Sequence, residues 1–291
     1  MEAFLHQVFS GIATGSIYAA MALALVMIYQ STQVVNFAQG EMAMFSTFIA
    51  WFLMQHGVPY WFTFIATVVI SFAIGAAIER VVIRPLHNAP EFSVIIVMIG
   101  LYCIINSLAG LFFTTDVRSF PSPFNLPADL MKGFMSPHEM GIIIVVLLVL
   151  AIVFCFFRFT SLGLAMRAAA QNPLSSRLVG IRVGNMLAIG WGLAAILGAI
   201  AGMMAAPVVL LDPNMMGTIL IYGFAGSLLG GITNPWGAVI GGIIVGVLEN
   251  IVGEYTFVGT ALKLTVALAV IIIVVTLKPS GLFGHKTMER V

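Results

Sequence analysis

The stretch GIIIVVLLVLAIVFCFF, Gly141–Phe157, decides the fold class because it is apolar on every side. A second stretch, LTVALAVIIIVVTL at Leu264–Leu277, has nearly the same character. Strands of a membrane barrel alternate apolar and polar residues over segments of about 10 positions, and neither stretch alternates. Both stretches therefore predict helices that are surrounded by lipid or by other apolar helices.

The composition of the whole chain agrees with this prediction. Of its 291 residues, 61% are hydrophobic and 8% are charged, and the mean hydropathy is +1.11. Soluble globular chains carry about 25% charged residues, so a soluble fold would leave much of this apolar surface uncovered. The expected fold is all-α, a polytopic transmembrane helical bundle of about 8–10 spans in a single domain over residues 1–291.

Breaks in hydrophobicity divide the chain into nine apolar segments, near residues 9–30, 37–55, 60–79, 92–113, 140–157, 186–206, 218–232, 236–252 and 261–277. The segment near 218–232 is short and glycine-rich, which is typical of a half-helix or a re-entrant element. Small residues recur every four positions in the sixth segment, at Gly190, Ala194, Gly198 and Gly202. Such faces let helix backbones approach closely in lipid, so we expect them to pack against other helices.

The segment VVNFAQGEMAMF, Val34–Phe45, places three polar residues between two apolar segments. It predicts an interrupted helix near residues 30–40. Asn36 is the expected N-cap of the new helix and Gln39 the expected N3 residue, as in a capping box. Transporters place substrate near the N-termini of such broken helices, where the helix dipole attracts a carboxylate.

Two faces of the new helix separate these polar residues. At about 100° per residue, one small or polar stripe contains Asn36, Gln39, Gly40, Ala43 and Thr47. This stripe is expected to line either a substrate pathway or a helix contact. Glu41 lies about 140° away from Asn36 and is expected to meet a neighbouring helix, a partner chain or the cytosolic interface.

The distribution of Lys and Arg orients the chain in the membrane. With the N-terminus outside and the C-terminus in the cytoplasm, nine of the twelve basic residues lie on the cytoplasmic side. They fall in a loop near 79–91, a loop near 158–186 and the C-terminal tail. The outer loop at 114–139 is rich in Pro and mixed in charge; it is either a simple connector or a docking site for an external partner.

The inner loop Arg158–Met186 carries four arginines and no acidic residue. Its segment Leu162–Gln171 has a helix-forming composition, and Asn172-Pro173 is expected to end that helix and to start a second short one. The arginines either enforce topology at the lipid headgroups or belong to a coupling element that inserts into a cytosolic motor subunit. The chain has no P-loop sequence of its own, so a motor would be a separate chain.

Other functional classes find little support in the sequence. The five histidines are scattered, and no metal-ligand or catalytic spacing occurs, so we expect no cofactor, metal or catalytic residue. Cys103 and Cys155 lie in apolar runs and are expected to be buried small hydrophobes. Glu79, beside Arg80 at a membrane edge, is expected either to extend its side chain to the interface or to pair there, as are Glu249 and Lys263 near the outer ends of their segments.

Three motifs in order resemble the LivH-type permeases, which are membrane subunits of branched-chain amino-acid ABC importers. They are GSIYAAMALALVMIY with VVNFAQGEMAM, RAAAQNPLSSRLVGI at Arg167–Ile181, and GSLLGGITNPWGAVIGGIIVGVLE at Gly226–Glu249. The resemblance covers residues 9–280. The family commonly has NFAHG where this chain has Gln39, so no imidazole is available there to titrate. The inner loop also lacks the EAA motif of many other ABC permeases.

The resemblance implies a multi-subunit importer in the bacterial inner membrane. Its partners would be a second, LivM-type permease chain, two cytosolic ATPase subunits and a periplasmic substrate-binding protein, with membrane lipid and a small-molecule substrate but no nucleic acid. The substrate would be a branched-chain or other small amino acid, or a related solute such as urea, an amide or an aromatic acid. The positions expected to dock the ATPase are Arg167, Ala169, Gln171, Asn172, Pro173, Arg177 and Gly180. The alternative function is a stand-alone carrier or channel.

Overall fold

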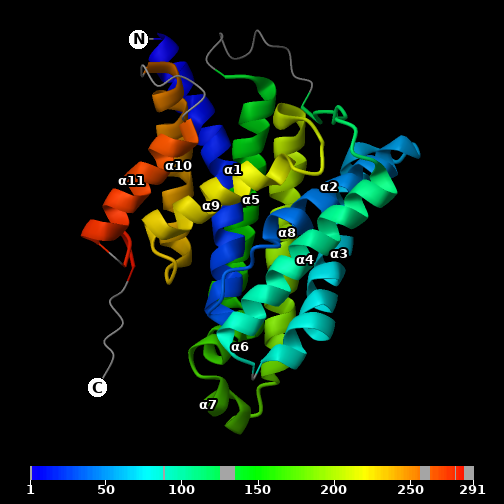
Figure 1. The fold of residues 1–291 in the computed structure, drawn as a ribbon, viewed down its shortest axis with the longest axis vertical. Coiled ribbons are helices and arrows are strands. Elements are labelled where there is room, and N and C mark those ends of the chain that lie inside the picture. The colour runs from blue at the N-terminus through cyan, green and yellow to red at the C-terminus, as the bar shows by residue number, and fades with distance from the viewer. Residues whose placement is uncertain (1, 88, 125–134, 256–262, 279, 285–291) are drawn as a thin grey trace. The chain divides into compact units, whose positions relative to one another are not determined.

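The structure, a computed structural model, describes residues 2–87, 89–124, 135–255, 263–278 and 280–284 (Figure 1). These residues are helical almost throughout, and their one β-type contact is an isolated bridge between Arg118 and Leu211. The helices are α1 Glu2–Thr32, α2 Gln39–Gln55, α3 Tyr60–Ile78, α4 Glu91–Phe113, α5 Pro137–Phe159, α6 Ser161–Gln171, α7 Pro173–Leu178, α8 Val183–Val209, α9 Met215–Gly230, α10 Pro235–Tyr255 and α11 Lys263–Leu277. A π-helix, η1 Glu79–Ile83, and a 3₁₀ helix, η2 Arg84–Leu86, follow α3.

The predicted all-α polytopic fold is confirmed. Each of the nine predicted apolar segments is a helix, namely α1 to α5 and α8 to α11. Six helices in the described part of the chain are long and apolar enough to cross a membrane, judged by length and composition. The glycine-rich helix α9 has 16 residues, which at 1.5 Å per residue span about 24 Å, less than the hydrocarbon core.

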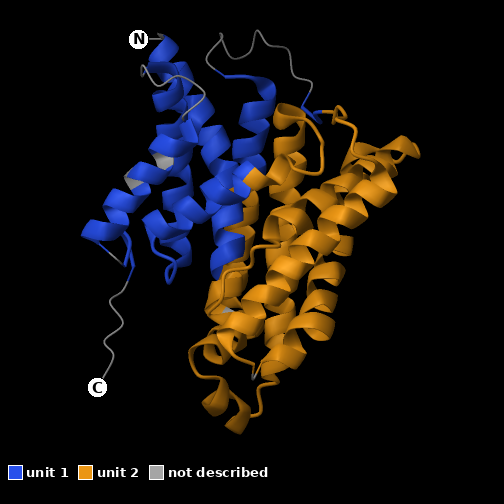
Figure 2. Cartoon of the chain, in the orientation of Figure 1, with its two compact units in different colours: residues 1–26, 122–145, 218–291 blue, residues 27–121, 146–217 orange. Residues whose placement is uncertain are grey.

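The chain divides into two compact units, which Figure 2 distinguishes by colour. Unit 1 comprises residues 1–26, 122–145 and 218–291. Unit 2 comprises residues 27–121 and 146–217, and it contains α2, α3, α4 and the short helices α6 and α7. Residues 125–134, within the predicted outer loop at 114–139, lie outside the described residues, as do Lys286 and Arg290 of the tail.

Glycines hold the helices of unit 2 close together. A Cβ added to Gly75 of α3 would lie 2.6 Å from the carbonyl oxygen of Trp191 in α8, and one on Gly192 would lie 2.5 Å from the ring of Phe72. Helices α3 and α8 accordingly make the most extensive helix contact within the described residues. On the predicted face of α8, a Cβ on Gly198 would lie 3.3 Å from Cβ of Ala43 and one on Gly202 would lie 3.0 Å from the Ala43 carbonyl oxygen, so these glycines serve helix packing as the sequence predicts.

Unit 1 uses the same device and adds a buried polar cluster. A Cβ on Gly226 of α9 would lie 2.6 Å from Gly242 of α10, so only glycine permits this approach. The hydroxyl of Tyr18 in α1 donates to Oε2 of Glu249 in α10 at 2.6 Å, and its ring stacks on Tyr222 of α9 at 4.8 Å. These contacts link three helices of the unit through groups that would otherwise be costly to place in lipid.

One burial prediction is wrong. Cys103 in α4 and Cys155 in α5 are free and exposed on the surface of the chain. An apolar helix in a membrane presents part of its surface to lipid, so an apolar surrounding sequence does not require burial inside the protein. Both thiols lie on surface that the sequence pattern could not distinguish from the core.

Candidate functional site

The break between α1 and α2 covers residues 33–38 and confirms the predicted interruption. Gln33 leaves helix α1 with a φ of 57°. The predicted cap is wrong in detail, because α2 begins at Gln39 with Ala38 as its N-cap and without a side-chain capping bond. Instead, Oδ1 of Asn36 accepts from the backbone N–H of Ala38 at 3.0 Å. Asn36 thus forms a tight local turn before the helix rather than its cap.

Asn36 and Gln39 form a hydrogen-bonded relay that reaches α8. Nδ2 of Asn36 donates to Oε1 of Gln39 at 3.3 Å, and Nε2 of Gln39 donates to the carbonyl oxygen of Ala194 at 2.9 Å. Both amides are fully buried. Gly198 leaves the room for this contact, because a Cβ there would lie 2.7 Å from Nε2 of Gln39. The relay therefore satisfies two polar side chains that lipid could not satisfy.

The rest of the polar stripe also faces α8. Thr47 is buried and donates to the carbonyl oxygen of Ala43 at 2.8 Å. A Cβ on Gly202 would meet the hydroxyl of Thr47 and would come within 3.0 Å of the Ala43 carbonyl oxygen. Gly40 is buried as well. In this structure the stripe is a closed helix contact, and its use as a substrate pathway stays a prediction.

Glu41 points to a different neighbour. Its side chain is 2% exposed, and its Oε2 accepts from Nδ2 of Asn106 in α4 at 3.1 Å. The same Nδ2 donates to the carbonyl oxygen of Pro213 at 3.1 Å. Within the described residues Glu41 has no Lys or Arg partner. A carboxylate held in the membrane by one neutral amide is unusual, because intramembrane charges are normally paired.

Asn106 is a site residue that was not predicted from the sequence. The available signal was its side-chain amide, the only one in the 23-residue helix α4. Such a residue in a span needs a partner within the protein. Helical periodicity could not identify that partner, Glu41, because it lies 65 positions earlier in the chain.

The predicted short helices of the inner loop are present as α6 and α7. Oγ1 of Thr160 caps α6 by accepting from Gly163 N–H at 3.0 Å. Asn172 caps α7 by accepting from Ser175 N–H at 2.9 Å, and Pro173 occupies the first turn. Asn172-Pro173 therefore ends one helix and begins the next, because Pro fits the first helical turn but not the interior.

The end of α7 is fixed by a Schellman motif. Gly180 has a φ of 85°, its N–H donates to the Arg177 carbonyl at 3.1 Å, and Ile181 N–H donates to the Ser176 carbonyl at 3.0 Å. Ile181 packs onto a buried cluster of Ala169 with residues of α8. Four of the predicted docking positions, Ala169, Asn172, Pro173 and Gly180, thus shape the helix pair; Ala169 is buried and the other three are exposed, and their contact with an ATPase stays a prediction.

The outer surface of this helix pair is apolar and basic. Leu174, Leu178 and Val179 are 75%, 84% and 75% exposed. Gln171 and Arg177 are exposed beside them. Figure 1 shows α6 and α7 grouped beside the end of α8 where that helix begins. We refer to Gln171, Leu174, Arg177, Leu178 and Val179 as the docking surface. Large apolar side chains exposed next to arginine are typical of a protein contact.

Arg167 differs from Arg177 in its surroundings. It lies over a small cavity that is also lined by Gln30 at the end of α1, Phe157 of α5 and Met186 of α8. Arg177 lies on α7, in the docking surface.

The described residues contain no group of three or more His, Cys, Asp or Glu side chains that could hold a metal ion.

Comparison with known proteins gives this geometry a context. Residues 7–275 match the family described as the permease component of branched-chain amino acid transport systems. The chain is 29% identical to the high-affinity branched-chain amino acid transport system permease protein LivH of Escherichia coli (strain K12), over 99% of this chain and 98% of that protein. BraD of Pseudomonas aeruginosa, a protein of the same description, is 29% identical over 99% of this chain and 98% of its own length.

A more distant relative is the probable branched-chain amino acid transport permease protein LivH of Methanocaldococcus jannaschii, 27% identical over 91% of this chain and 87% of that protein. The solved structure of PsaBC from Streptococcus pneumoniae in complex with Fab aligns with 92% of this chain and 88% of that chain. Its TM-score of 0.48 at 11% identity is too low to support an argument. The match over residues 7–275 is decisive: this multi-pass membrane protein belongs to the family of permease components of branched-chain amino acid transport systems.

Proposed function

We propose that this chain is the membrane-spanning permease subunit of an ATP-binding-cassette importer, using ATP that separate subunits hydrolyse. The substrate proposed is a branched-chain or other small amino acid, or a related small polar solute. The observation that carries the proposal is the family match over residues 7–275, which includes both the interrupted helix and the α6–α7 pair. The relatives' names, with near-complete coverage at 29% identity, support the amino-acid substrate.

The assembly that we propose contains a second, LivM-type permease chain, two cytosolic ATPase subunits and a periplasmic substrate-binding protein. It lies in the bacterial inner membrane with the N-terminus of this chain outside and its C-terminus in the cytoplasm. The bias of Lys and Arg toward one set of loops supports this orientation. Both compact units would act within one transmembrane permease domain over residues 1–291.

The ATPase would bind at the docking surface. Three features support this role: the helix pair is capped at both starts, its end is fixed by Gly180, and its exposed side chains include the apolar Leu174, Leu178 and Val179. A segment that only anchored topology would need basic residues, not a capped helix pair that exposes Leu174 and Leu178. Charge reversal at Arg177 is expected to weaken ATPase binding, and reversal at Arg167 to weaken it less because Arg167 lies over the cavity.

The substrate pathway would follow the polar stripe of α2, namely Asn36, Gln39, Gly40 and Thr47. In the closed contact Gln39 donates to the Ala194 carbonyl of α8, and the hydroxyl of Thr47 lies against Gly202 of the same helix. Separation of α2 from α8 would free the Gln39 amide and the Ala194 carbonyl, which suit the carboxylate and the ammonium group of an amino acid. Gln39→Ala or Asn36→Ala should therefore slow transport more than assembly, and equal loss of both would contradict the assignment.

Glu41 would hold α2 against α4 during transport. Its bond to Asn106, which also binds the carbonyl of Pro213, ties α2 to α4 and to the segment after α8. This arrangement supports an interhelical or coupling role rather than a contact with substrate.

The test of the proposed function is co-purification followed by reconstitution. The chain is produced with the ATPase, second permease and binding protein of its own organism, and uptake of labelled leucine, urea and benzoate into proteoliposomes is measured with ATP supplied on the ATPase side. Uptake of leucine that needs ATP and the ATPase supports the importer. Uptake by this chain alone, without ATP, would support the carrier or channel instead.

A further inference from the structure

The end of α3 is irregular in a way that brings two charged side chains together. The α-helix gives way at Glu79 to the π-helix η1 and then to the 3₁₀ turn η2. Pro85 is a physical cause, because it has no N–H to donate and its ring excludes a regular turn before it. Single π-turns of this kind occur often at functional positions.

Glu79 and Arg84 form a two-point ion pair across this irregular turn. Nη2 of Arg84 lies 3.0 Å from Oε2 of Glu79, and Nε donates to Oε1 at 3.4 Å. The Glu79 side chain is 1% exposed, whereas the Arg84 side chain is 33% exposed. The partner predicted by adjacency in sequence, Arg80, points outward and is exposed.

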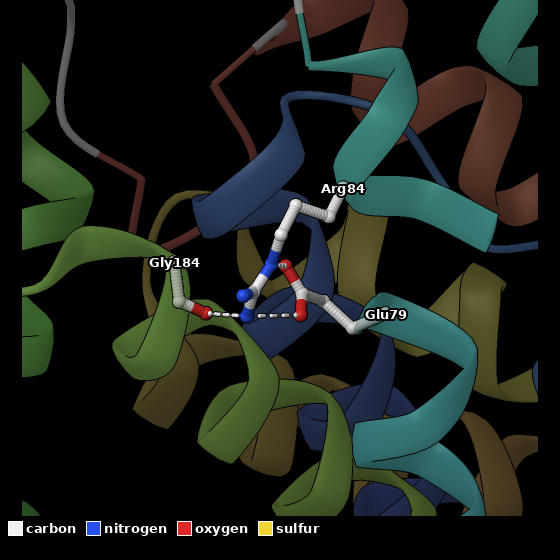
Figure 3. Close-up of polar contacts among 3 residues, drawn as sticks. All are labelled: Glu79, Arg84 and Gly184. Carbon is white, nitrogen blue, oxygen red and sulfur yellow. Dashed lines mark hydrogen bonds and ion pairs between the residues drawn. The ribbon is translucent and has the colours of Figure 1, made fainter. Parts of the chain in front are cut away.

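Arg84 also reaches the start of α8. Its Nη2 donates to the carbonyl oxygen of Gly184 at 2.6 Å, so one guanidinium bridges the carboxylate of Glu79 and the backbone of a second helix (Figure 3). A Cβ on Gly184 would lie 3.2 Å from Cζ of Arg84. Glycine at this position therefore allows the guanidinium to approach the helix backbone.

The place of Gly184 in the chain gives this bridge its meaning. Arg182 is the N-cap of α8, and the docking helices α6 and α7 end only a few residues earlier. Along the chain, α7 leads into the membrane helices at this turn of α8, while α6 follows directly from α5. The bridge joins that turn to the end of α3, the helix with the most extensive contact to α8.

An ion pair with one buried partner is a poor means of adding net stability, because desolvation of the buried charge offsets the attraction. Its better attested use is to fix one arrangement of elements against others. The three-point geometry of Glu79, Arg84 and Gly184 suits that use, since the guanidinium can satisfy both partners only in one relative position of α3 and α8.

We propose that Glu79 and Arg84 are positioning residues that make the end of α3 move together with the first turn of α8 when an ATPase subunit acts on the docking surface. This inference rests on the proposed function and adds a specific linkage to it. Without the linkage, ATP hydrolysis would still move α6 and α7, but the membrane helices would follow incompletely. The expected defect is loss of coupling rather than loss of assembly.

Three variants test the linkage from different sides. Glu79→Gln and Arg84→Gln each remove one charge of the pair. Gly184→Val leaves both charges in place and displaces the guanidinium from the α8 backbone. Arg80→Gln, a neighbouring exposed arginine, is the matched control.

The experiment uses the full reconstituted complex. Assembly is followed by size-exclusion chromatography, and ATP hydrolysis and leucine uptake are measured on the same proteoliposomes. All three variants should assemble and hydrolyse ATP as the unaltered complex does, while uptake per ATP falls about 10-fold, within the usual range of coupling between sites. Arg80→Gln should keep the original ratio.

Several results would overturn the proposal. An unchanged ratio of uptake to hydrolysis in Gly184→Val would do so, as would parallel loss of both activities in intact complexes. Failure of all three variants to assemble would assign the bridge to folding. Absence of ATP-driven uptake in the unaltered complex is a separate result, and it would reject the proposed function itself.

Discussion

The α2–α8 contact buries small and polar side chains, whereas the α6–α7 pair leaves large apolar side chains exposed. Between α2 and α8, glycines at positions 198 and 202 bring backbones together, and the polar groups of Gln39 and Thr47 are buried and satisfied. On α7, Leu174 and Leu178 are exposed, while the polar side chain of Asn172 caps the helix.

This difference separates surfaces that are complete from surfaces that need a partner. In lipid, small residues gain contact by letting helices approach, and no further chain is required. Large apolar side chains in water gain only when another protein covers them. Added side-chain volume should therefore lower the stability of the α2–α8 contact. Loss of apolar side chains on α7 should instead lower the affinity for a partner.

The largest effect is expected at Gly198. Gly198→Val would collide with the Gln39 amide and with Cβ of Ala43. Overpacking of this kind costs about 1–3 kcal/mol, and loss of the buried Gln39 bond adds about 1–3 kcal/mol more. The midpoint temperature of thermal unfolding, measured on the purified protein in detergent, should fall by several degrees, or the variant should aggregate.

Gly100→Ala in α4 is the control, because a Cβ there meets no heavy atom within 4 Å. It should keep or slightly raise stability, since alanine is the better helix former. If both variants unfold alike, the contrast between a closed contact and an open surface is mistaken.

The next effect is expected on the docking surface. Leu174→Ser combined with Leu178→Ser removes two exposed apolar side chains and should leave thermal unfolding unchanged. Interface anchors contribute at least about 2 kcal/mol, so affinity for the ATPase should fall about 30-fold or more. Binding of purified ATPase to detergent-solubilised protein measures this. If the double variant instead has lower thermal stability and unchanged ATPase affinity, Leu174 and Leu178 serve folding rather than docking.

A smaller effect is expected at Glu41. Glu41→Ala leaves Nδ2 of Asn106 without its carboxylate partner and should reduce assembly or coupling, with a loss of about 1–3 kcal/mol. Glu41→Gln keeps an acceptor for Asn106 and should behave nearly as the unaltered protein does. The uptake rate and the yield of intact complex are measured for both variants. A change of substrate preference in Glu41→Ala would place this side chain in the pathway instead.

The smallest effect concerns the cap of α7. Asn172→Ala removes one capping bond, which contributes about 1 kcal/mol to a helix. Because α7 is held at its other end by the Gly180 turn, ATPase affinity should drop only a few-fold. Asn172→Ser, which can cap the helix, should restore affinity, and equal loss in both variants would assign Asn172 to the contact itself.

The sequence predicted the elements of this fold well because their signals are local. Nine apolar segments, the break before α2 and the two short helices around Asn172-Pro173 all follow from residues within a few positions of each other. The cap at Ala38 did not follow, because the Asn36 side chain accepts from the Ala38 N–H and forms a turn instead.

Partners distant in sequence account for most of what could not be predicted. Glu41 binds Asn106, Gln39 binds the carbonyl of Ala194, and Arg84 reaches Gly184 across 100 positions. Helical periodicity places a residue on a face but does not say which helix that face meets. The exposure of Cys103 shows the same limit, because a face toward lipid and a face toward protein have similar composition.

The most direct measurement of the central claim is leucine uptake into proteoliposomes that contain the complete complex, compared with proteoliposomes that lack only the ATPase. We predict uptake that depends on ATP, on the ATPase and on Leu174 and Leu178 of this chain. Equal uptake in the two preparations, or uptake driven by an ion gradient without ATP, would contradict it.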